Sequence, residues 1–216
     1  MPAPLDVIIR KHVAPMAKQE GVPRKGRYFR LEGEHGHTLL YFDTFNLYQT
    51  ELCFEVGFAL LPLTYWDFTC QLYEGGGAPT IPGRESIFLY SWLMPPDEWS
   101  YRPAEKPPYT FRRRWSLNDL GDLDSLGAAL AQRVQEEAFP RMRQLLDLEF
   151  ALAELRTPTF ATQLALASDA ARELVLMLDT LDPERVEELL ADPVQPRNAL
   201  FEGWVRERVA RRTAER

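Results

Sequence analysis

The sequence predicts an α+β fold: an antiparallel sheet of about five strands, an N-terminal helix, and a C-terminal helical bundle packed on one face of the sheet. Between about residues 26 and 117, apolar and polar side chains alternate with the period of two that is typical of half-buried strands. From residue 118 onward, apolar residues recur at three- and four-residue steps, as in amphipathic helices. Because strands and helices are grouped rather than alternating along the chain, α+β is favoured over α/β.

The bulk properties indicate one globular chain in a reducing compartment. We expect residues 1–118 to hold the N-terminal helix and the sheet, and residues 119–216 to form a helical part packed on the sheet as one compact unit. The 216 residues suffice for a substantial core, and 45% of them are hydrophobic. No run of about 18 apolar residues is present, and the opening MPAPLDVIIRKHV meets charge too early for a signal peptide. Two cysteines do not make a disulfide framework, so we expect a cytoplasmic protein.

The first element is predicted to be a helix. Its apolar residues, Leu5, Ile8, Ile9, Val13 and Met16, recur at helical spacing. Pro15 is expected to kink this helix or to start a new turn, and Gly21 is expected to end it.

The strands follow in order. GRYFRLE, HTLLYFDTF and ELCFEVGFALL alternate, and the third does so most clearly, so it is predicted to be a half-buried antiparallel strand. SIFLYSWLM is apolar on both faces, which indicates a central strand covered on both sides. YTFRRRWSL is predicted to place Arg113 and Trp115 on one face, and Arg112 and Arg114 on the other.

The helices begin at recognisable signals. Asp122 or Asp124 is expected to cap the first one, which Pro140 then interrupts. A further helix is predicted over TFATQLALASDAARELVLMLD, opened by Thr157 or Thr159. DPERVEELLAD has aspartate at the N-cap followed by proline, and the last helix is expected from about Arg197.

The segment EGEHGHTLL raises the question of a metal site. His35 and His37 would share a face of an extended segment, but zinc needs three or four ligands, and His12 lies on the first helix. Gly33 and Gly36 instead suit a tight connection between two strands. We therefore predict a solvated hairpin turn here, no metal site and no cofactor.

Charge is unevenly distributed along the chain, whose net charge is −7. Residues 119–192 hold 16 acidic and 6 basic residues, whereas residues 1–118 hold 13 of each kind. The acidic block argues against a nucleic-acid-binding protein. It fits a solvated helical surface, with attraction of a basic partner as the alternative.

Arginines define the candidate binding site. An arginine on a strand face must be paired or must reach solvent, because an unpaired buried charge is costly. Possible carboxylate partners on neighbouring strands are Glu51, Glu55 and Asp43. The structural interpretation is a cross-strand ladder of ion pairs. The functional interpretation is a sheet face that grips a ligand or partner, and it consists of Arg30, Tyr41, Asp43, Glu55, Arg112 and Arg114.

The sequence shows no motif that names a reaction. No serine lies in a Gly-x-Ser-x-Gly context, and the glycine-rich loop after Tyr73 lacks the Gly-Lys-Ser/Thr of a phosphate loop. The adjacent pairs Glu136–Glu137 and Glu187–Glu188 point apart on their helices. Tyr65, Trp66, Phe68, Tyr73, Trp92, Trp99 and Tyr101 are expected to fill the core rather than to line a pocket.

One resemblance extends over roughly residues 5–150. DVIIRKHVAPMAKQEGVPRKGRYFRL, followed by LLYFDTFNLYQTELCFEVGFAL, resembles a bacterial family known as domain of unknown function 4304. The Trp115 strand and the helix beginning at Asp122 are similar in placement. Val22–Pro23 stands where that family more often has glycine and phenylalanine. The resemblance implies no established reaction, so it assigns no catalytic residue.

The leading functional hypothesis is a non-enzymatic cytoplasmic binding protein, immunity-like or scaffold, that uses the polar face of its sheet and the adjoining Gly/Pro-rich loops. Its partner is expected to be another protein. The alternative is an enzyme that clamps a small anionic substrate with arginines and uses Asp43 or Glu55 as general base. A third hypothesis is homo-oligomerisation through the C-terminal helices.

Overall fold

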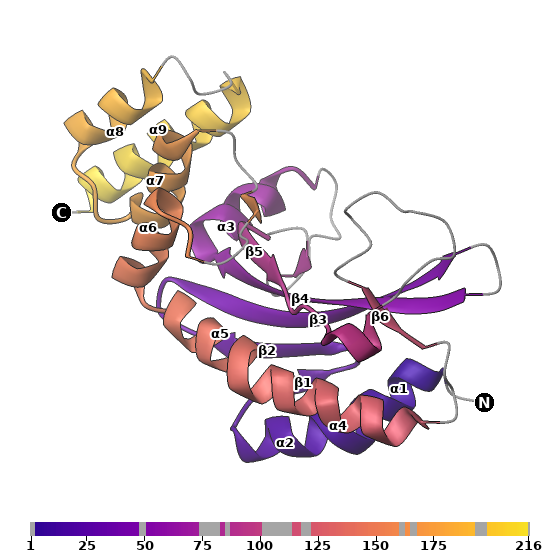
Figure 1. The fold of residues 1–216 in the computed structure, drawn as a ribbon. Coiled ribbons are helices and arrows are strands. Elements are labelled where there is room, and N and C mark those ends of the chain that lie inside the picture. The colour runs from indigo at the N-terminus through magenta and orange to yellow at the C-terminus, as the bar shows by residue number, and fades with distance from the viewer. Residues whose placement is uncertain are drawn as a thin grey trace. The chain divides into compact units, whose positions relative to one another are not determined.

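The chain is α+β, as the sequence predicts. The computed structural model describes residues 3–47, 51–73, 83–84, 87–100, 114–117, 122–159, 163–164, 168–192 and 198–215. Figure 1 shows the N-terminal helical segment, the strands of a long hairpin and the C-terminal helices in chain order.

The described strands form one sheet. They are β1 (Arg24–Lys25), β2 (Tyr28–Glu32), β3 (Gly36–Leu47), β4 (Glu51–Pro62), β5 (Leu89–Trp92), β6 (Arg114–Ser116) and β7 (Gln163–Leu164). Their order is β1-β2-β3-β4-β5-β7, and β6 also pairs with β4. The Phe88 and Leu93 amides donate to the carbonyls of Leu60 and Val56, so β5 runs antiparallel beside the second half of β4. The antiparallel pairing of β6 with the first half of β4 continues the same edge.

The helices have clear sequence causes. They are α1 (Pro4–Ile8), α2 (Ala14–Gln19), α3 (Leu63–Gln71), α4 (Leu123–Arg133), α5 (Phe139–Leu145), α6 (Leu148–Arg156), α7 (Asp169–Met177), α8 (Pro183–Leu190) and α9 (Ala199–Ala214). Asp122 caps α4, and Asp182 with Pro183 opens α8, as predicted. Gly21 ends the first helical segment with φ of 70°, a conformation that glycine adopts without strain.

Two prolines lie inside continuous helices instead of ending them. Short π-helical segments, η1 (Ile9–Val13) and η6 (Val134–Ala138), end two residues before Pro15 and Pro140. The amides of Ala14 and Phe139 donate to the carbonyls five residues earlier. In the wider π turn, these carbonyls accept from the amide of the residue that precedes the proline. The proline itself has no amide hydrogen to donate. The prediction that Pro140 interrupts the helix was therefore wrong.

Three further differences concern burial and element type. The strand ELCFEVGFALL is buried on both faces where its side chains are described, so it is not the half-buried strand that its alternation predicted. Helix α3 was not foreseen, because no regular apolar period marks LTYWDFTCQ. Helix α7 begins after the Ser168 cap, and Gln163–Leu164 form β7, so the helix predicted from Thr157 or Thr159 starts later.

The chain divides into two compact units, each of which combines segments from different parts of the sequence. Unit 1 comprises residues 1–31, 38–59 and 90–144, and unit 2 comprises residues 32–37, 60–89 and 145–216. In unit 1, Figure 1 shows α1, α2 and α4 side by side along one face of the strands. The proposed separation into a sheet part and a helical part stays a prediction.

Substituting alanine for two helical glycines, one in a packed position and one in an open position, tests the packing of α4. A Cβ added at Gly127 of α4 would lie 2.3 Å from Cδ2 and 2.7 Å from Cγ of His12, whereas a Cβ at Gly203 of α9 meets nothing within 4 Å. We expect Gly127→Ala to lower the free energy of unfolding by about 1–3 kcal/mol through overpacking. Gly203→Ala should raise it by about 1 kcal/mol through helix propensity. Urea unfolding followed by circular dichroism measures both, and equal signs for the two variants would contradict the packing of α4 against His12.

Candidate functional site

Strand alternation in unit 1 brings the predicted polar residues onto one side of the sheet. The ring of Tyr41 lies over Gly57, where a Cβ would come within 2.3 Å of it. Glu55 lies two residues before Gly57 and therefore faces the same way. On the other side, Phe29 contacts Phe42 with ring centroids 5.9 Å apart. We call the side with Arg30, Tyr41, Asp43, Glu55, Gly57 and Arg114 the polar face.

The hairpin register sets Asp43 opposite Glu55. Tyr41 packs on Gly57 across the hairpin, and the Leu63 amide donates to the His35 carbonyl at its base, which gives the same register. Moving two residues along each strand from Tyr41 and Gly57 leads to Asp43 and Glu55. Two carboxylate residues thus lie across from each other on the polar face.

Arg114 completes this row from the next strand. Glu55 and Arg114 are direct partners in the β4–β6 pairing, and Arg114 Nε donates to Glu55 Oε1 at 3.0 Å. The two side chains are only 2% and 12% exposed, respectively. The pair is the ion pair that the structural interpretation of the arginine cluster predicted. A buried pair of this kind is costly to break, so Arg114 has a structural role in addition to any binding role.

The other members of the predicted site differ in exposure. Tyr41 is buried, with its ring edge-on to Trp92 at a centroid distance of 6.1 Å. Arg30 and Asp43 are half-buried and lie on neighbouring strands of the polar face. Arg112 lies outside the described residues, as does most of the glycine-rich loop. The half-exposed positions are therefore Arg30 and Asp43, with the exposed Tyr28 two residues before Arg30.

Tyr28 was missed in the sequence analysis as a candidate for contact. It is 40% exposed, and it pairs with Lys25 across the β1–β2 hairpin. The alternation of GRYFRLE already indicated that Tyr28 and Arg30 share a face. What the sequence did not show is that β1 and β2 lie at the edge of the described sheet, where that face reaches solvent.

A small cavity lies on the other side of unit 1. It measures about 280 Å³ and is lined by Ala3, Pro4, Leu5, Arg27, Thr44, Cys53 and Leu117. Arg27 is bound there by Asp6, whose oxygens accept from it at 2.6 and 3.0 Å. The Arg27 guanidinium holds the pKa of the Asp6 carboxyl below its ordinary value. The guanidinium is thus already neutralised by a protein carboxylate, and neither Asp43 nor Glu55 lines this cavity.

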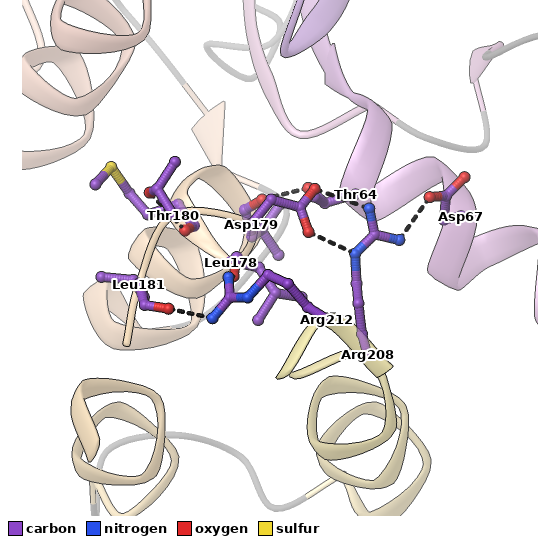
Figure 2. Close-up of polar contacts among 10 residues, drawn as sticks. Thr64, Asp67, Leu178, Asp179, Thr180, Leu181, Arg208 and Arg212 are labelled. Carbon is purple, nitrogen blue, oxygen red and sulfur yellow. Dashed lines mark hydrogen bonds and ion pairs between the residues drawn. The ribbon is translucent and has the colours of Figure 1, made fainter. Parts of the chain in front are cut away.

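Unit 2 contains a polar cluster that joins three helices (Figure 2). Arg208 of α9 donates to both oxygens of Asp179 at 2.7 and 2.8 Å, and to Asp67 of α3 at 2.7 Å. Arg212 donates to the carbonyls of Leu178 and Leu181 after α7. The cluster therefore satisfies carbonyls at the end of α7 and ties α9 to α3.

The ion pairs of this cluster are suited to holding helices together and not to catalysis. The Arg208 guanidinium, assisted by Arg212, lowers the pKa of the Asp179 carboxyl. The two aspartates in turn raise the pKa of Arg208. A general base works best with a pKa near the operating pH, and these interactions move both groups away from it. Sequence reasoning missed the cluster because its members lie far apart in the chain.

The histidine segment forms the predicted hairpin turn. The Gly33 amide donates to the Gly36 carbonyl at 2.9 Å, and Glu34 and His35 are exposed. His12 lies elsewhere, in unit 1, with its Nε2 3.2 Å from Asp124. Across the described part of the chain, no group of three or more histidine, cysteine, aspartate or glutamate residues is arranged to hold a metal ion.

Comparison of the chain with protein-family models, with curated proteins and with solved structures found no match. The resemblance to the domain of unknown function 4304 family stays a prediction. Within the described ranges, no helix has the length and apolar character needed to cross a membrane.

Proposed function

We propose that this chain is a non-enzymatic cytoplasmic binding protein whose protein partner docks on the polar face. One observation carries the proposal: the buried Glu55–Arg114 pair shares its face of the sheet with the half-buried Arg30 and Asp43. Tyr28 adds an exposed aromatic ring at the edge of this face. Arginine and tyrosine are enriched among the residues that dominate binding energy at protein interfaces.

The burial gradient across the polar face supports docking more than catalysis. Glu55 is 1% exposed and has an arginine as its direct strand partner, so it is poorly placed to take a proton from a substrate. The buried pair instead joins β6 to β4, next to the strand β3 that carries Asp43. Small bacterial immunity proteins and scaffold proteins have such a docking role, and the comparison with them is an analogy.

The enzyme alternative has one observation in its favour. Asp43 lies opposite Glu55 with Arg114 beside them, and paired carboxylates next to an arginine suit a general base and an anion clamp. Such an enzyme would need a cavity lined by one of these carboxylates. The lining of the unit 1 cavity contains neither Asp43 nor Glu55.

Charge reversal on the polar face tests the proposal. The immobilised protein is exposed to native extract of the source cells, and captured proteins are identified by mass spectrometry. We expect Arg30→Glu to weaken capture of the specific partner at least tenfold, because it places a negative charge inside the interface. Lys18→Glu is the matched control: Lys18 is exposed on α2 in the same unit, and the charge change is identical. It should leave capture unchanged.

Stability is measured on the same variants, because a misfolded protein would also lose its partner. Lys18 is exposed, so Lys18→Glu should change the free energy of unfolding by less than about 0.5 kcal/mol. Capture by Arg30→Glu is measured at a temperature at which this variant is fully folded. Full capture by Arg30→Glu, or equal loss in both variants, would contradict docking on the polar face.

A further inference from the structure

Helices α8 and α9 of unit 2 form an open groove. It has a volume of about 570 Å³ and is lined by Pro183, Val186, Glu187, Arg206, Val209, Ala210, Thr213 and Ala214. Val186 and Val209 form its buried floor, whereas Ala210, Thr213 and Ala214 are exposed along α9. The lining is therefore apolar, and the side chains along α9 are small enough for another helix to approach closely.

The only two charged residues of the lining neutralise each other. Arg206 donates to both oxygens of Glu187, at 3.0 and 3.2 Å, which spans the groove from α9 to α8. An occupant of the groove therefore does not need to supply a charge to this pair. What it must supply is an apolar helical surface with small side chains, and α9 itself has such a surface.

Two exposed residues of opposite charge border the groove. On α8, Glu184 is exposed one position from the lining residue Pro183. On α9, Arg211 is exposed one position from the lining residue Ala210. A twofold axis through the groove would place Glu184 of one copy opposite Arg211 of the other, and each contact would occur twice.

We propose that the α8–α9 groove is the contact surface of a homodimer, in which α9 of each copy packs against the groove of the other. Arg208 and Arg212 bind residues that follow α7, and Arg206 binds Glu187. Arg211 is therefore the arginine that reaches the second copy. Arg211 is 59% exposed, and its ion pair within the chain is a long 3.7 Å contact with Glu207. Its counterpart is Glu184, which is exposed on α8 one position beyond the groove.

Sedimentation velocity over a series of protein concentrations tests this dimer. The wild-type chain should be dimeric at high micromolar concentration, and Ala210→Glu should be monomeric, because it buries a carboxylate in the contact. Ala128→Glu, at an exposed alanine of α4 outside the groove, should remain dimeric. A monomeric wild-type chain, or a dimer that survives Ala210→Glu, would overturn the proposal and leave the groove to a different occupant.

A charge swap at two exposed positions tests the pairing directly. Glu184→Arg and Arg211→Glu should each raise the dissociation constant by roughly two- to thirtyfold, since the twofold axis repeats each exposed pair. The double variant should restore wild-type affinity. Failure of the double variant to recover would overturn the assignment of Arg211 to Glu184. The dimer is independent of docking on the polar face, so either proposal can fail while the other stands.

Discussion

Arg114→Met should lower the free energy of unfolding by about 3–5 kcal/mol, the usual cost of removing one partner of a buried ion pair. Glu55 is 1% exposed, and Arg114 is its direct cross-strand partner at 3.0 Å. The substitution would leave the carboxylate inside the sheet without this cation. Urea unfolding followed by far-ultraviolet circular dichroism measures the loss.

The double variant Glu55→Leu/Arg114→Met shows whether the loss of stability comes from breaking the ion pair or from changing the side chain at each position. A buried pair that is replaced by apolar side chains of similar volume is often neutral or more stable, since the desolvation cost of both charges disappears. We therefore expect the double variant to recover most of the stability lost in Arg114→Met. Additive losses from the two single substitutions would show that Glu55 and Arg114 do not interact.

Trp115→Ala should lower the free energy of unfolding by about 3–5 kcal/mol, because it empties a buried site beside β4. Trp115 is fully buried, and its ring stacks on Phe54 with centroids 5.9 Å apart. Its Nε1 donates to the Leu93 carbonyl at 3.0 Å. The side chain therefore joins β6 to β4 and to the end of β5, and the same unfolding experiment measures its contribution.

Trp115→Phe is the control for this second prediction. It keeps an aromatic ring on Phe54 but leaves the Leu93 carbonyl without its donor, so we expect a smaller loss of about 1–3 kcal/mol. A Trp115→Ala variant that is no less stable than Trp115→Phe would contradict the packing of this ring against β4.

Several elements could be predicted from local sequence because their causes are local. The Asp182–Pro183 helix start, the Gly21 stop and the Gly33–Gly36 hairpin each depend on residues within one turn. Helix α3 could not be predicted, because LTYWDFTCQ buries Thr64, Phe68 and Thr69 against neighbours that are distant in sequence. The continuous helices through Pro15 and Pro140 depend on a π turn that has no sequence signature.

The side of the sheet to which the candidate site residues point could be predicted from the sequence, but the burial of their side chains could not. Period-two alternation indicated that Arg114 faces the same side as carboxylates, and it pairs with Glu55. Alternation gives the side to which a residue points but not what covers that side, so it could not show that Glu55 is buried while Arg30 is half-exposed. The Arg208–Asp179–Asp67 cluster joins residues up to 141 positions apart, for which one sequence carries no signal.

The most direct test is the affinity of the captured partner for Glu55→Leu/Arg114→Met compared with Arg30→Glu. We propose that half-exposed residues of the polar face contact the partner, while the buried pair only joins β6 to β4. The double variant, once shown to be folded, should bind within about threefold of wild type, a difference of less than 1 kcal/mol. Arg30→Glu, equally folded, should bind at least tenfold more weakly. Wild-type affinity in Arg30→Glu together with lost binding in the double variant would contradict the claim.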